Sequence, residues 1–349
     1  MAGPSSSGPR AGVLVLAGVG LLLVVGRLWG HGLEQPALPA RVSPSVDGQV
    51  FAPVRPLPDG LEFAQPINGL AVTPAAVWVA YGTTIARLDP HTLQVTASLQ
   101  VTAAITGVPL TAWPVRGLAA GKDAIWVSLS SPSADLLRID PSTARVTAVV
   151  PQPTVAPVAV GNSGVWVVCC GGETYLGAGQ LARVDPATNR VTARIALPGF
   201  AAAVGVGPSG VWVRAAAGPV WRIDPATNRV AATVTVPHGL GGGQGSVLVS
   251  RDAVWVSDPS TGTVLRIDPH SNRIAGRTEV AGPALAAAAD GTVVATGQAR
   301  VFGLGRWPVR SVGVDGVDGK YVTALAADAD SIWIAESSVL LHVDQRGLR

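Results

Sequence analysis

One phrase of the sequence is written twice, almost unchanged. The letters ARVDPATNRVTARIALP occupy residues 182–198, and RIDPATNRVAATVTVP begins at residue 222. A second phrase, an aromatic residue between two β-branched ones, recurs every 39 to 48 residues. Its copies are centred on Trp78, Trp126, Trp166, Trp212, Trp255 and Trp333, with a degenerate copy at Val294. Copies at a steady period indicate a repeat protein, whose units bury their apolar faces against one another.

Each unit contains four short extended runs. In the fifth unit they read SVLVS, AVWVS, TVLRIDP and NRIAGRTEV. The first two are apolar and β-branched, as in strands buried on both faces, and the last alternates like an outer strand. The Asp-Pro segment between the third and fourth runs predicts a turn, in which Asp accepts backbone hydrogen bonds and Asn tolerates a left-handed conformation.

Seven such units predict an all-β fold, a seven-bladed β-propeller of four-stranded antiparallel blades over residues 45–349. The degenerate sixth unit includes ALAAAADG at 284–291, which we interpret as a strand because of its register. The seventh unit has expected strands at 323–328, 331–336 and 339–344 and lacks a fourth. Residues 49–58, QVFAPVRPLP, match the fourth-strand pattern, so we expect the N-terminal strand to complete the last blade and remove an open edge.

The stretch VWVSDPSTGTVLRIDPHSNRI, which begins at Val254, resembles the repeat of the YVTN-type bacterial β-propeller proteins. The resemblance covers roughly residues 60–349. It implies a seven-bladed propeller of the surface-layer or periplasmic kind. It implies little about function, because such repeats serve many roles.

The N-terminus reads as a membrane element. Residues 11–26 contain no charged or strongly polar side chain, Arg27 can extend toward the lipid headgroups, and Trp29 suits the interface. We expect residues 1–10 to be a cytoplasmic tail, 11–29 a single-pass transmembrane signal anchor in the lipid bilayer, and 30–44 a Pro-rich linker. The propeller would then lie on the outer side of the cell membrane. A cleaved signal peptide, and hence a secreted protein, is the alternative.

Charge argues against a nucleic-acid partner. Residues 1–44 hold three of the 25 basic residues and one of the 22 acidic residues, which leaves 22 against 21 in the remainder. Nucleic-acid binding requires a concentrated basic face, and the sequence of this nearly neutral domain does not predict one.

Repetition separates scaffold from site, because a residue present in most units has the same role in each. We therefore assign the tryptophans and the Arg-x-Asp pairs to the scaffold; the pairs are Arg87/Asp89, Arg138/Asp140, Arg183/Asp185, Arg222/Asp224 and Arg266/Asp268. Antiparallel topology puts the uniform turns on one face, the uniform face. The irregular connections fall on the other, the variable face; they span 58–69, 102–117, 169–180, 237–246 and 315–321. A ligand or partner is expected there or at the channel mouth.

The candidate ligand-binding residues on the variable face are His238, Gln244, Glu173, Tyr175, Trp113 and Arg116. The adjacent Cys169 and Cys170 are a possible vicinal disulfide, which would be strained, or two free thiols. His91 and His270 follow Asp-Pro turns on the uniform face, and His342 occupies an Arg position of the repeat. No metal-ligand spacing is present, and we expect no metal or cofactor.

These observations favour a binding or scaffold module, with a small ligand or an envelope protein as partner, over an enzyme. The alternative is a lyase, lactonase or redox enzyme that uses His238, Glu173 and the cysteine pair at the channel mouth. Propellers similar to this one include the virginiamycin B lyase family, whose blades read Trp-Phe-Thr-Glu. Here only Ile334-Ala335-Glu336 comes near that pattern, which disfavours the lyase interpretation.

Overall fold

The computed structural model describes residues 54–57, 60–107, 115–129, 135–151, 154–169, 179–236, 245–258, 260–280, 285–287, 293–297, 300–304, 310–313, 322–328 and 330–344. All of them belong to the second of two compact units, Met1–Ala37 and Leu38–Arg349. The tail, anchor and linker expected over 1–10, 11–29 and 30–44 lie outside these residues. Within the described part, no helix has the length and apolar character needed to cross a bilayer.

The described part is all-β apart from one short helix, α2 (Ala103–Thr106). Six sheets have four antiparallel strands each, and we call them blades one to six. Blade one consists of β3 (Ile67–Thr73), β4 (Ala76–Tyr81), β5 (Thr84–Leu88) and β6 (Val95–Gln100), and blade two of β7 (Val115–Ala120), β8 (Ile125–Leu129), β9 (Asp135–Asp140) and β10 (Arg145–Pro151). Blade three consists of β11 (Thr154–Gly161), β12 (Gly164–Cys169), β13 (Gln180–Asp185) and β14 (Arg190–Ala196), and blade four of β15 (Ala201–Gly207), β16 (Gly210–Ala215), β17 (Val220–Asp224) and β18 (Arg229–Val234). Blade five consists of β19 (Val247–Val249), β20 (Val254–Asp258), β21 (Thr263–Asp268) and β22 (Arg273–Glu279), and blade six of β23 (Leu285–Ala287), β24 (Val293–Gly297), β25 (Arg300–Leu304) and β26 (Arg310–Gly313).

A five-stranded sheet, the closing sheet, joins the two ends of the domain. Its order is β27 (Val322–Ala327), β28 (Ser331–Glu336), β29 (Val339–Asp344), β2 (Gly60–Phe63) and β1 (Val54–Leu57). The expectation of seven four-stranded blades is therefore wrong: six have that form. The expected closing strand at 49–58 is also corrected, because β2 pairs with β29 and β1 lies outside it. Pro56 has no N–H to donate, which suits it to this outermost strand.

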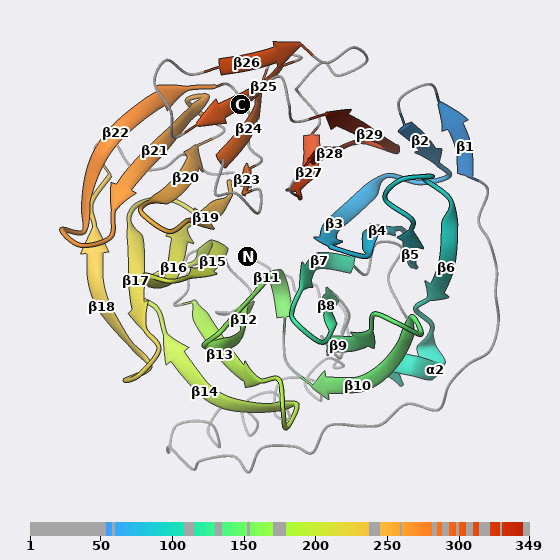
Figure 1. The fold of residues 1–349 in the computed structure, drawn as a ribbon. Coiled ribbons are helices and arrows are strands. Elements are labelled where there is room, and N and C mark those ends of the chain that lie inside the picture. Colours follow the sequence, from blue (N-terminus) through green and yellow to red (C-terminus); the bar gives the residue numbers. More distant parts are fainter. Residues whose placement is uncertain are drawn as a thin grey trace, which may run out of the picture. The chain divides into compact units, whose positions relative to one another are not determined.

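The innermost strands succeed one another round a closed ring, as Figure 1 shows: β3, β7, β11, β15, β19, β23 and β27, with β27 in contact with β3 again. The core lies between neighbouring sheets. The second strands are buried along most of their length, as predicted, and the six tryptophans of the repeat lie there, each 5% exposed or less. The outermost strands alternate; β22, for example, shows exposed and half-buried residues in strict succession.

The turn between the third and fourth strands has the predicted chemistry. In blade three, Asp185 Oδ1 accepts a hydrogen bond from the backbone N–H of Ala187 (2.9 Å), and Asn189 has a φ of 55°. Asn228 and Asn272 adopt the same left-handed conformation in blades four and five. Leu93 and Ala144 adopt it in blades one and two, without the side chain that favours it. In the sixth unit, the strand expected at 284–291 is present as β23, and its remaining residues lie outside the described part.

Candidate functional site

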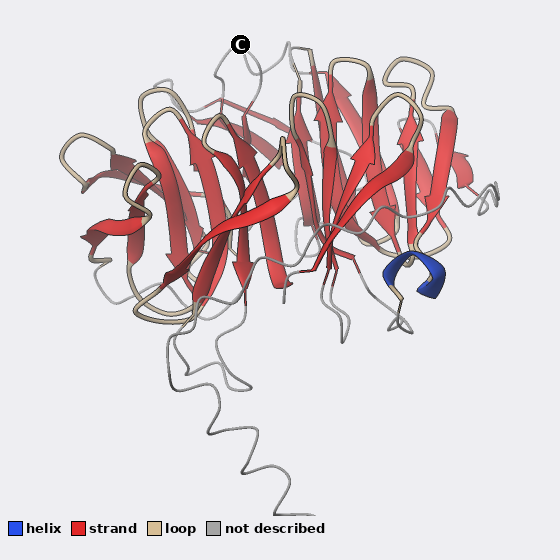
Figure 2. Ribbon diagram, turned by 90° about the horizontal axis from the view of Figure 1, so that it is seen from below, coloured by secondary structure: helices blue, strands red, loops and turns tan. Residues whose placement is uncertain are grey.

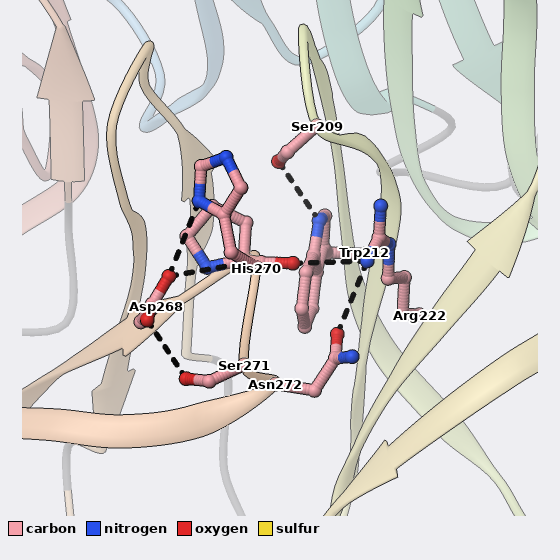
Figure 3. A network of polar contacts seen from close by, with 8 residues as sticks. Ser209, Trp212, Arg222, Asp268, His270, Ser271 and Asn272 are labelled. Atoms are coloured by element: carbon pink, nitrogen blue, oxygen red, sulfur yellow. Dashed lines mark hydrogen bonds and ion pairs between the residues drawn. The ribbon is translucent and has the colours of Figure 1, made fainter.

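The Arg-x-Asp motif joins blades, and Figure 3 shows one such joint. Arg222 Nη1 donates hydrogen bonds to the carbonyl oxygen of Pro269 (2.9 Å) and to Asn272 Oδ1 (3.3 Å) in the turn of the next blade. The pattern repeats for Arg183 with Pro225 and Asn228, and for Arg87 with Pro141 and Ser142. The arginine bonds the backbone of the neighbouring turn, and each aspartate accepts hydrogen bonds within its own turn.

The same arginines cover the tryptophans. The Arg183 guanidinium carbon lies 5.3 Å from the centroid of the Trp166 ring, and that of Arg222 lies 5.7 Å from the Trp212 ring. In the closing sheet His342 takes the arginine position and stacks on Trp333 at 4.5 Å. These residues serve the scaffold, as the repeat predicted, so functional residues must be sought where units depart from the pattern.

The innermost strands β3, β7, β11, β15 and β27 all bulge near their first residues, on the variable face, so the bulge belongs to the repeat and the departure lies in which residue it skips. In β3 the pairing with β4 skips Asn68, in β7 the pairing with β8 skips Arg116, and in β27 the pairing with β28 skips Thr323. A β-bulge of this kind re-aims one side chain, and bulges are common beside active sites. Since β27, β3 and β7 are neighbours in the ring, these three polar bulge residues are consecutive, whereas the bulge in β15 skips Ala202. We call Thr323, Asn68 and Arg116 the mouth residues.

The mouth residues differ in how far their polar groups are engaged. The Thr323 hydroxyl donates to the carbonyl oxygen of Ala335 (3.3 Å), and Arg116 is exposed. The Asn68 amide nitrogen is buried, and no hydrogen-bond partner for it is present among the described residues. The half-buried Glu336 pairs in register with Val322, directly before the Thr323 bulge. The mouth thus carries an exposed cation on β7, an amide on β3 and a carboxylate on β28, a set suited to binding a polar ligand.

A second departure is a buried charge pair between blades four and five. Arg214, the second residue after Trp212, is 0% exposed, where other units have small or apolar residues: Ala80, Ser128, Val168, Ser257 and Ala335. Asp258 on β20 is 3% exposed. Burial lowers the pKa of the Arg214 guanidinium, and the charge of Asp258 acts in the opposite direction. Burial raises the pKa of Asp258, but hydrogen bonds from Ser260 and Thr261, together with Arg214, bring it below its ordinary value.

Of the residues that the sequence singled out for ligand binding, the described part contains Arg116. His238, Gln244, Glu173, Tyr175 and Trp113 lie outside the described residues, as does Cys170, so their roles stay predictions. Cys169 is buried at the end of β12, and the state of the cysteine pair remains a prediction. The enzyme alternative depends on these residues and is untested. Among the described residues, no group of three His, Cys, Asp or Glu side chains could hold a metal ion.

Sequence reasoning missed Asn68, Thr323, Arg214 and Asp258. A signal for Arg214 was available, because it replaces a small or apolar residue at a fixed distance from the repeat tryptophan; the signal for Asp258 was weaker, because the same position holds Glu336 after Trp333. The bulges had no such signal, because the register between strands is not readable from a residue pattern alone. The histidine placements are confirmed for His91 and His270, whose backbone N–H groups donate to the aspartates of their turns.

Comparison with solved structures places the domain among the β-propellers. Virginiamycin B lyase from Staphylococcus aureus superposes with a TM-score of 0.64 and 15% identity, over 80% of this chain and 95% of that one. The Pan2 WD40 domain of Neurospora crassa superposes with a TM-score of 0.62 and 11% identity, over 82% of this chain and 91% of that one. PorZ of Porphyromonas gingivalis, a component of the type-IX secretion system, gives 0.58 and 14%, over 82% of this chain and 38% of that one.

At these identities the likeness shows the fold alone. No family model, the YVTN-type repeat included, and no curated protein matches the sequence. The chain is thus an all-β propeller with bacterial and eukaryotic structural neighbours, and the YVTN-type resemblance stays a prediction.

Proposed function

We propose that this chain is a ligand-binding β-propeller, held at the outer side of the cell membrane by residues 11–29, and that its ligand binds at the mouth of the ring on the variable face. The observation that carries the proposal is that three neighbouring innermost strands present a polar residue at the bulge, namely Thr323, Asn68 and Arg116, where β15 has Ala202. Their position supports a binding role, because the uniform face is occupied by turns that join the blades.

The chemistry of the mouth limits the ligand. An exposed guanidinium binds carboxylate or phosphate groups through two parallel hydrogen bonds, so Arg116 suits a ligand with one acidic group. Glu336 lies on the closing sheet, next to the Thr323 bulge, and would disfavour a second negative charge at that end of the mouth. A small molecule or protein segment that carries a single carboxylate next to hydrogen-bonding groups fits this set best.

Membrane attachment is supported by the apolar run at 11–26 with Arg27 and Trp29 at its end. The test is extraction of the full chain from membranes of an expressing cell, with protease added to intact spheroplasts. We expect resistance to alkaline extraction and digestion of the propeller from outside. A chain lacking residues 11–29 should leave the membrane fraction. Recovery of the full chain in the cytosol would contradict the proposal.

Ligand binding is tested by cross-linking the full chain in its membrane and comparing three proteins: wild type, Arg116→Ala and Lys122→Ala. Lys122 is exposed, and it lies in the turn between β7 and β8 on the uniform face, so its variant controls for a lost surface charge. We expect adducts shared by wild type and Lys122→Ala to be lost in Arg116→Ala. Equal adducts in all three would place binding away from the mouth.

A further inference from the structure

The outermost strands of four consecutive blades carry exposed arginines. They are Arg145 on β10, Arg190 and Arg194 on β14, Arg229 on β18, and Arg273 and Arg277 on β22. We call this set the arginine belt. The one acidic residue on these four strands is Glu279, at the end of β22. The belt lies on the rim of the ring, where Arg145, Arg190, Arg229 and Arg273 directly follow the turns between the third and fourth strands and Arg194 and Arg277 lie farther from them.

Carboxylates of the adjacent turns neutralise only part of the belt. Arg190 and Arg273 stand opposite Asp185 and Asp268 in the strand register, yet the oxygens of these aspartates accept hydrogen bonds from their own turns. Arg194 and Arg277 lie four residues farther along, about 13 Å away at the usual rise of a strand. In the strand register Arg194 stands opposite Ala182 and Arg277 opposite Leu265. Among the described residues, neither arginine has an ion-pair partner.

The rim limits what can bind the belt. In Figure 1, β10, β14, β18 and β22 follow one another round the outside of the ring, so each faces a different direction. A flat surface such as a bilayer can touch only neighbouring blades at one time, whereas a flexible polymer can follow the curve. No aromatic residue occurs in these four strands, so they offer no platform on which nucleic-acid bases could stack.

We propose that the arginine belt binds a flexible phosphate-bearing polymer without bases, such as polyphosphate or a polyol phosphate. Guanidinium groups bind phosphate oxygens through paired hydrogen bonds, and a chain that spans several blades gains affinity by releasing its counterions. The interaction uses neither the mouth residues nor the membrane segment, so it stands independently of the proposed function.

The test uses the full chain in a nonionic detergent and long-chain inorganic polyphosphate as the probe, with binding followed by calorimetry over a range of salt concentrations. The variant is Arg194→Glu with Arg277→Glu. The matched control is Lys122→Glu with Arg251→Glu, which changes the net charge equally through two exposed residues of the uniform face. Thermal unfolding checks that both variants fold.

We expect the belt variant to weaken polyphosphate binding by about tenfold or more and to reduce the salt dependence of the logarithm of affinity by about two units, one per lost phosphate contact. The control should change the affinity by less than about threefold, as for a loss of net charge alone. Equal weakening by the two variants would overturn the proposal.

Two further arms separate the sources of phosphate. A single-stranded oligonucleotide of equal charge should bind no more tightly than polyphosphate, and tighter binding would point to base recognition and overturn the proposal. Phosphatidylglycerol mixed into the micelles should compete only weakly. If the lipid binds and polyphosphate does not, the belt is a membrane contact and the proposal fails. Arg116→Ala should bind polyphosphate as the wild type does.

Discussion

Arg222 and Pro269 join two blades: the arginine's Nη1 lies 2.9 Å from the proline's carbonyl oxygen, in the turn of the next sheet. The guanidinium that makes this bond also covers Trp212. The Arg-x-Asp motif therefore supplies the two halves of a joint. The arginine of one blade reaches the turn that the aspartate of the next blade holds in shape, and the repeat of the motif fixes the angle between blades.

Loss of this arginine should loosen the joint. We expect Arg222→Ala to reduce the free energy of unfolding by about 1–3 kcal/mol, because it removes hydrogen bonds from a charged donor and uncovers an aromatic ring. The free energy of unfolding of Arg222→Lys should lie between those of the wild type and Arg222→Ala, since an ammonium group lacks the planar fork of a guanidinium. Urea unfolding measures the change. Arg229→Ala, at an exposed position on β18, should change the free energy of unfolding by no more than about 0.5 kcal/mol. A loss as large as that of Arg222→Ala would show that Arg222 does not join the blades.

Ala144 offers a stabilising change. It adopts a left-handed φ of 55° in the turn that Arg87 reaches, at the position where blades three to five have Asn189, Asn228 and Asn272. Ala144→Asn should raise the free energy of unfolding by about 1 kcal/mol, because Asn tolerates this conformation and can accept a bond from Arg87. Ala144→Gly separates the effects: it relieves the backbone without an acceptor. If Asn gains no more than Gly in thermal unfolding, the acceptor contributes nothing.

The repeat predicted the sheets well because it records local chemistry. The tryptophan marks a strand buried on both faces, and Asp-Pro followed by Asn marks a turn, so strands such as 331–336 and 339–344 were found at their observed bounds. Closure was predicted less well. Residues 49–58 and 60–63 both suit an outer strand, and the choice between them depends on pairing with β29, at the opposite end of the chain.

The candidate site was harder to predict for a related reason. Arg116 was named because its loop is irregular, but Asn68 and Thr323 join it only through bulges, which arise from strand register in three dimensions. The arginine belt could not be predicted from the net charge, because the net charge sums over the whole domain. The domain is nearly neutral overall, while the alternation of the outermost strands gathers one sign of charge on the exposed rim.

Acid should destabilise the turns. The pKa of Asp224 lies below its ordinary value because the backbone N–H of Ala226 and the hydroxyl of Thr227 donate to the carboxylate, and Asp89, Asp140, Asp185 and Asp268 are lowered in the same way. Their contribution is complete above the unfolded value of about 4 and is lost as pH falls through the folded values. Chemical unfolding between pH 6 and about pH 2 should show the decline.

The decline can be assigned to the turns with one pair of variants. Asp224→Asn removes a titrating group, so it should lower stability at pH 6 and flatten the fall in acid. Asp252→Asn, in the exposed turn before β20, controls for the lost charge. If Asp224→Asn and Asp252→Asn both keep the wild-type dependence of the free energy of unfolding on pH, the turn carboxylates are not the source of the decline in acid.

Closure of the ring depends on a glycine. Gly60 lies so close to the carbonyl oxygen of Leu340 that a Cβ would overlap it, and the pairing of β2 with β29 requires this approach. Gly60→Val should reduce the free energy of unfolding by about 1–3 kcal/mol and promote aggregation, because the edge of β29 would lose its partner. Gly276→Ala, whose Cβ would meet only Arg266 at 3.9 Å, should leave the midpoint of thermal unfolding nearly unchanged.

The buried pair of Arg214 and Asp258 tests whether a departure from the repeat serves stability. Asp258→Ala alone should reduce the free energy of unfolding by about 3 kcal/mol, because it leaves the guanidinium buried beside less compensating charge. The repeat supplies the apolar alternative: Val168 and Ala215 occupy the same positions in other blades. Arg214→Val with Asp258→Ala should therefore recover much of that loss, since no charge remains buried. If the double variant lost as much free energy of unfolding as the two single variants together, the two residues would act separately. Recovery of stability would mean that the pair is retained for a purpose other than folding.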